Sequence, residues 1–145
     1  MTRKIIIIIL SIIILYFAYD WFFGIDSNNP DCYGNKTLFK KTFKLDKIPT
    51  DVSDIRCYSD HIGADFAEEI SFECDSATFK KIIITLKLSK QKEVPNFGRY
   101  LYKSLRKEID TLVGFTDYKV KKQSPYHSFW YNITNRHAYF LTYSL

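Results

Sequence analysis

The feature that most constrains this chain of 145 residues is its N-terminal apolar run, TRKIIIIILSIIILYFAYDWFF. Residues 5–19 contain no charged side chain, and Ser11 and two tyrosines supply the only polar side-chain atoms. A helix formed by these residues would be apolar on every side and would have no polar stripe to turn toward water. The run therefore argues against a core helix of a globular domain and favours a segment that meets a membrane.

The length of the run favours a membrane anchor. A helix rises about 1.5 Å per residue, so fifteen residues reach ~22 Å and nineteen reach ~28 Å, against a hydrocarbon core of ~30 Å. Trp21, Phe22 and Phe23 follow the run and are typical of the aromatic belt at a membrane surface. Cleavage of a signal peptide needs small residues in an A-x-A-like pattern, which the segment lacks. We therefore predict an uncleaved signal-anchor helix over residues 1–23, with a cleaved signal peptide as the alternative.

The charges around the run predict its orientation. Arg3 and Lys4 precede it, whereas three aspartates and no basic residue follow it before Lys36. The positive-inside rule then keeps the N-terminus in the cytoplasm and places residues 24–145 on the outer side of the cytoplasmic membrane. Residues 24–36 are polar and rich in turn formers, which predicts a stalk. Residues 37–145 are long enough for one small domain with its own core.

The periodicity of residues 37–145 predicts an α+β domain. Leu101, Leu105, Ile109 and Leu112 recur at helical spacing, so we expect one amphipathic helix over residues 96–113. Alternation of apolar and polar residues predicts about seven strands. These strands are residues 41–48, 54–60, 68–75, 79–89, 118–123, 128–134 and 138–145. The expected fold is a single N-terminal transmembrane helix followed by a small antiparallel β-sheet domain with one packed amphipathic helix.

Three cysteines, Cys32, Cys57 and Cys74, follow the apolar run. In an oxidising compartment two of them should pair. If residues 54–60 and 68–75 form a hairpin around Ala64, Cys57 and Cys74 come nearly opposite each other, so we predict a Cys57–Cys74 disulfide. Pairing of Cys32 with either of the others is the alternative. The cysteines lack the short paired spacing of a zinc site, so we expect no metal.

No recognisable catalytic motif is present, so we expect neither an enzyme nor a cofactor. Asp60, His61 and Asp65 lie within six residues and are the only candidate acid–base cluster, which we interpret as a polar loop. His127 and His137 are interpreted as exposed turn residues. The formal net charge of +5 comes from dispersed lysines and arginines, so no nucleic-acid partner is expected.

Aromatic residues supply the candidate binding surface. Phe, Tyr and Trp make up 25 of the 145 residues, and in SFWYNIT alternation places Trp130 on a mixed polar and aromatic face. Trp and Tyr are the residues that most often anchor a protein partner, so Trp130 and Tyr126 are the predicted partner-binding residues. The alternative is that these rings fill a small core. Asn35 and Asn132 each open a formal glycosylation sequon.

The combination of an anchor and a small aromatic-rich outer domain is similar to many small bacterial envelope proteins, some of which are immunity proteins. This similarity lies in architecture and not in any motif. We therefore expect a membrane-tethered extracytoplasmic protein-binding module, of an immunity or inhibitor type. The alternatives are a structural subunit of an envelope membrane complex, and a secreted protein or hydrolase with an unrecognised site.

Overall fold

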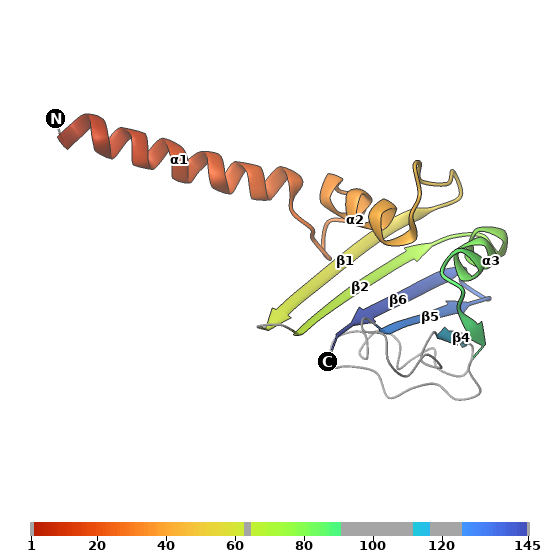
Figure 1. Cartoon of the computed structure of the whole chain (residues 1–145). Helices are drawn as coiled ribbons and strands as arrows, with labels where there is room; N and C mark the ends of the chain where they lie inside the picture. The colour runs from red at the N-terminus through yellow and green to blue at the C-terminus, as the bar shows by residue number, and fades with distance from the viewer. Residues whose placement is uncertain (1, 63–64, 91–111, 117–125, 145) are drawn as a thin grey trace.

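The structure is a computed structural model that describes residues 2–62, 65–90, 112–116 and 126–144 (Figure 1). Within these residues the fold is α+β, with two of the three helices packed on one antiparallel sheet. The helices are α1 (Thr2–Phe23), α2 (Tyr33–Phe43) and α3 (Ser76–Thr85). The strands are β1 (Ser53–Ile62), β2 (Asp65–Glu73), β3 (Ser89–Lys90), β4 (Leu112–Thr116), β5 (Tyr126–Asn132) and β6 (His137–Tyr143). Their order in the sheet is β1-β2-β6-β5-β4-β3.

Four strands of the sheet, β1, β2, β5 and β6, confirm predicted strands. β1 and β2 form the hairpin expected from residues 54–60 and 68–75, and β5 and β6 form the one expected from residues 128–134 and 138–145. β6 also pairs with β2, so the last strand of the chain joins the two hairpins. Alternation was a reliable signal here because each strand has one face against the main core.

α3 replaces a predicted strand over residues 79–89. The helix begins at Ser76, after the N-cap residue Asp75, and its start is held by Asp51, which is far away in the sequence. Its carboxylate accepts hydrogen bonds from the backbone N–H of Asp75 at 2.9 Å and from the Thr78 hydroxyl at 3.0 Å. Burial raises the pKa of Asp51, but these hydrogen bonds outweigh burial and hold that pKa below its usual value. Phe79 is buried in the core from this helix.

α2 replaces the predicted strand over residues 41–48, and it begins earlier, at Tyr33. Cys32 is the N-cap, and its Sγ accepts the backbone N–H of Asn35 at 3.5 Å. Phe39 and Phe43 are four residues apart and therefore lie on one face of the helix, where both are buried. The phenylalanine spacing is helical, although it also fits the alternation on which the strand prediction rested.

The predicted amphipathic helix over residues 96–113 lies almost entirely outside the described residues. Its last two residues, Leu112 and Val113, belong to strand β4. The predicted strand over residues 118–123 also lies outside the described part.

The core lies between one face of the sheet and helices α2 and α3. Phe43 contacts Phe72 and Phe140 edge-to-face, with ring centroids 5.5 and 5.0 Å apart. Phe79 packs on Phe129 with ring centroids 4.6 Å apart. Edge-to-face and offset contacts at these distances add stabilisation beyond the burial of apolar area. These phenylalanines therefore build much of the main core.

Asn35 fixes the segment before α2 to the sheet. Its side-chain Nδ2 donates to the carbonyls of Asp26, Asn29 and Ile55 at 2.7–3.1 Å, and its Oδ1 accepts the N–H of Asp26 at 2.9 Å. The side chain is fully buried. Residues 24–36, expected to form a stalk, thus include the start of α2 and contact β1. Both sequon asparagines, Asn35 and Asn132, are buried and hydrogen-bonded.

α1 extends away from the sheet (Figure 1). The prediction of a transmembrane helix over residues 1–23 is wrong. In the described part of the chain, no helix combines the length and the apolar character needed to cross a membrane. α1 has 22 residues, but Arg3 and Lys4 precede its uncharged stretch and Asp20 follows it. The remaining fifteen residues rise only ~22 Å, which is less than the ~30 Å hydrocarbon core.

The predicted Cys57–Cys74 disulfide is also wrong, because all three cysteines are free. In the β1–β2 register Cys57 lies opposite Ile70, whereas Cys74 follows the end of β2 four residues further on. Four residues of a strand span ~13 Å, and a disulfide needs Cα atoms within ~7 Å. The register differs from the predicted one by enough to separate the two thiols.

Candidate functional site

The predicted binding residues Trp130 and Tyr126 both belong to β5. Trp130 is fully buried in a second cluster, on the sheet face opposite the main core, with Tyr139 and Leu141. The expected exposed aromatic face is therefore covered at Trp130. Tyr126 pairs with Tyr143 of β6, and its side chain lies outside the described part. A role of these two residues in binding stays a prediction.

The Asp60, His61 and Asp65 cluster lies in strands. Asp60 and His61 pair with Ala67 and Phe66, and Asp65 opens β2 opposite Ile62. Their side chains lie outside the described part of the structure. The residues are thus positions of the β1–β2 hairpin where the sequence suggested a loop.

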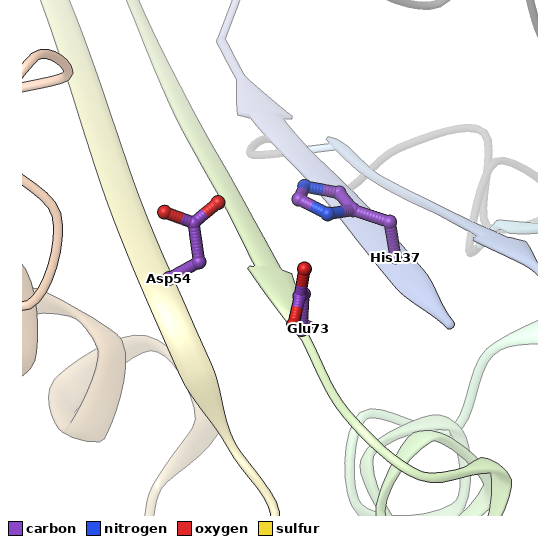
Figure 2. A group of neighbouring side chains, drawn as sticks. All are labelled: Asp54, Glu73 and His137. Carbon is purple, nitrogen blue, oxygen red and sulfur yellow. The ribbon is translucent and has the colours of Figure 1, made fainter. Parts of the chain in front are cut away.

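A different group of side chains does come together. Asp54, Glu73 and His137 each place one potential metal-ligand atom within 4.8 Å of the others (Figure 2). They come from three neighbouring strands, β1, β2 and β6. Glu73 is exposed, whereas Asp54 and His137 are half-buried. Figure 2 shows the carboxylates of Asp54 and Glu73 and the ring of His137 on the same side of the sheet.

The sheet register explains why these residues meet. Glu73, the last residue of β2, lies opposite Ser53 of β1 and opposite His137 of β6. Directly opposed residues point to the same face of a sheet, so Glu73 and His137 are neighbours. A β-bulge between Ser53 and Arg56 adds one residue to β1. Asp54 lies in this bulge with a left-handed backbone (φ 52°), and such bulges redirect a side chain.

Two neighbours hold the carboxylates in place. Arg56 donates from Nε and Nη2 to the same oxygen of Asp54, Oδ1, at 3.0 and 2.8 Å. These hydrogen bonds raise the pKa of Arg56 further above its usual value. The Ser53 hydroxyl donates to Oε2 of Glu73 at 3.4 Å. Each of these neighbours binds only one of the two oxygens of its carboxylate.

Sequence reasoning missed this group. His137 was interpreted as an exposed turn residue, but it is the half-buried first residue of β6. Its partners lie far away in the sequence, and no motif spacing connects Asp54 to Glu73 or to His137. Only the strand register and the bulge could have revealed the group, and neither can be read from one sequence.

The buried thiols are poor candidates for chemistry. Burial raises the pKa of Cys57 to about 12, with the nearby Cys32 and Glu68 adding to the effect. Burial likewise raises the pKa of Cys74 to about 12. The thiolate is the nucleophile and the metal ligand, so both groups are unreactive at neutral pH.

The last candidate feature is the apolar surface of α1. The large apolar side chains of residues 5–19 are 45–68 % exposed. Elsewhere in the described chain, exposed large apolar side chains are isolated, as at Ile84 and Ile133. A contiguous apolar surface of this size marks an interaction site.

The chain matches no protein-family model, no curated protein and no solved structure.

Proposed function

We propose that the protein is a protein-binding module whose interaction element is α1. The observation that supports the proposal is the exposure of residues 5–19, whose large apolar side chains are 45–68 % accessible in the isolated chain. Leaving apolar surface in water costs roughly 25 cal/mol per Å², so such a helix is stable only when another apolar surface covers it.

The distribution of the exposed residues favours a particular kind of partner. Neighbouring residues of a helix point about 100° apart, so Ile12, Ile13 and Ile14 face three directions. Their exposed fractions are 60, 45 and 65 %. A helix that is apolar all round is stable when it is buried on every side. We therefore infer a partner protein that encloses α1, in an apolar groove or among several helices, rather than one that covers a single stripe.

The sheet domain folds independently of α1, which supports a role of α1 in binding. Its main core is closed by α2 and α3, so folding of the domain does not require the surface of α1. A folded domain carrying one binding helix confines that domain to the place where its partner lies, which raises its effective concentration there. An immunity or inhibitor role and a location outside the cytoplasmic membrane stay predictions, on which the binding proposal does not depend.

The test is site-specific photo-cross-linking in cells that express the full-length protein. A photoreactive residue is placed at Ile12, at Ile13 or at Ile14, and Ile84 serves as the matched control. Ile84 is 76 % exposed on α3, so it presents an equally accessible isoleucine outside α1. We expect all three α1 positions to cross-link to one and the same protein, and the control to give no such product.

Reconstitution completes the test. The cross-linked protein, purified and mixed with the full-length chain, should form a complex of fixed stoichiometry. Replacing Ile7, Ile14 and Phe17 together by Gln should abolish that complex, whereas Ile84→Gln should leave it intact. Cross-links to lipid or to a second copy of the chain at all three positions, with no other protein, would contradict the proposal.

A further inference from the structure

We propose that Asp54, Glu73 and His137 bind one divalent transition-metal ion of the Zn²⁺ class. The inference is independent of the binding role of α1, because the three residues lie on the sheet. It rests on the convergence of two carboxylates and one imidazole from β1, β2 and β6 (Figure 2).

The spacing of the ligand atoms suits a metal ion. Zn²⁺ binds carboxylate oxygen and imidazole nitrogen at ~2.0–2.2 Å, so tetrahedral ligand atoms lie about 3.3 Å apart. The three ligand atoms here are within 4.8 Å of one another. To bind an ion, the ligand atoms must move closer together by a small adjustment of the side chains. Glu73 is the residue most able to make this adjustment because it is exposed.

The composition of the ligand set selects the ion. Carboxylates alone favour Mg²⁺ or Ca²⁺, whereas an imidazole favours Zn²⁺, Ni²⁺, Cu²⁺ or Co²⁺. Three protein ligands leave the fourth tetrahedral position open to water or to a group from another molecule. The site would therefore hold an exchangeable ligand on the ion.

The backbone holds the three ligands on rigid elements. Glu73 is paired on both sides, with Ser53 and with His137, so its position depends on two strand ladders. Asp54 reaches the same place through the bulge of β1. Ligands carried by strands are held more accurately than ligands carried by loops, which reduces the cost of ordering them around an ion.

The hydrogen bonds of Arg56 and Ser53 each use one oxygen of the carboxylate that they bind. Arg56 binds Oδ1 of Asp54 only, so Oδ2 remains for the ion. Ser53 binds Oε2 of Glu73, so Oε1 remains. Outer partners of this kind orient ligating carboxylates in metal sites. The positive charge of Arg56 repels a bound metal ion, but the two negative charges of Asp54 and Glu73 outweigh this repulsion.

The experiment titrates the full-length protein, kept dispersed in a mild detergent and stripped with a chelator, with Zn²⁺ and with Co²⁺. Zn²⁺ binding is measured by calorimetry, and Co²⁺ binding by its visible absorption. All proteins carry Cys32→Ser, which removes the one cysteine that is not buried and keeps a good N-cap residue. We expect one ion per chain and no thiolate-to-cobalt charge-transfer band.

Two ligand variants and one control decide the outcome. Glu73→Gln and His137→Asn should each weaken Zn²⁺ binding by at least about tenfold, because each removes one of three ligands. The matched control Asp46→Asn removes an exposed carboxylate elsewhere and should leave binding unchanged. Because Glu73 is exposed, its variant tests the site without endangering the fold. Unchanged Zn²⁺ affinity in both ligand variants, or a charge-transfer band from cysteine, would overturn the proposal.

Discussion

Helix α1 and the sheet core are the two most apolar regions of the described chain, and they treat their apolar side chains in opposite ways. In the core, Phe39, Phe43 and Phe72 are at most 1 % exposed and contact one another. In α1, Phe17 is 66 % exposed. The apolar side chains of the core are buried when the domain folds, whereas those of α1 stay exposed and can contact another molecule. The comparison separates the stability of the protein from its capacity to bind.

The largest expected effect tests this separation directly. Phe72→Ala removes a fully buried ring and should lower the free energy of unfolding by about 3–5 kcal/mol. The matched variant Phe17→Ala in α1 should change it by less than about 0.5 kcal/mol, because exposed positions contribute little. Urea denaturation followed by tryptophan fluorescence measures both. Equal destabilisation by the two variants would mean that α1 belongs to the folding unit.

The next effect concerns the contact between the segment after α1 and the sheet. Asn35→Ala removes a buried side chain that makes four hydrogen bonds to the backbone, and it should cost about 2–4 kcal/mol. Asn28→Ala, an exposed asparagine in the same segment, is the control and should cost almost nothing. The same denaturation curves measure both. A small cost for Asn35→Ala would show that residues 24–36 are only loosely attached to the sheet.

Alkaline pH should weaken the core through its two buried thiols. Their pKa rises from the ordinary 9.0 to about 12 on folding, so above pH 9 the unfolded chain releases protons that the folded chain keeps. The stabilising contribution is complete below pH 9 and is lost as pH rises toward 12. At pH 10 the loss should be about 1.4 kcal/mol per thiol relative to pH 8.

Cysteine variants isolate this effect from the titration of lysines and tyrosines. The free energy of unfolding is measured between pH 8 and pH 10 for the wild type, for Cys74→Ala and for the double variant Cys57→Ala with Cys74→Ala. The single variant should lose about half of the thiol-dependent decline and the double variant all of it. A decline of the same size in the double variant would assign the pH dependence to other groups.

The smallest effect is expected at an exposed ion pair. Arg136, in the turn between β5 and β6, pairs with Asp75 before α3, and both side chains are more than half exposed. Arg136→Gln should cost about 0.5 kcal/mol at low ionic strength and less at high salt, as is usual for surface ion pairs. Thermal unfolding at two salt concentrations checks this. A cost above about 2 kcal/mol would show that the turn contributes to the core.

The sequence predicted those parts of the fold whose pattern depends on neighbouring residues alone. The alternation around Ile70 and Phe72 predicted β2, because both residues lie on one face of that strand and are fully buried. Residues 76–85 form a helix despite their β-branched run, because Asp51 holds the start of the helix and because Phe79 and Ile82 meet the core one turn apart. A contact with a residue as distant as Asp51 cannot be recognised from the local pattern.

The candidate site was less predictable than the fold. Alternation shows which residues share a face of a strand, but it does not show what covers that face. Trp130 was therefore predicted to be exposed to a partner, although it is buried. The group of Asp54, Glu73 and His137 depends on a bulge in β1 and on the pairing of β2 with β6. Both are long-range properties, so the histidine and the carboxylates looked unrelated in the sequence.

The hydrogen bonds of Ile55 have a consequence for self-association. β1 is at the margin of the sheet, and an unpaired strand margin invites pairing with another chain. The carbonyl of Ile55 already accepts from the N–H of Asp31 and from Asn35, and its N–H donates to the Asp31 carboxylate at 3.4 Å. The chain thus blocks this part of the strand against intermolecular β-pairing. The same few contacts that fix the segment after α1 therefore also shield the start of β1 from an incoming strand.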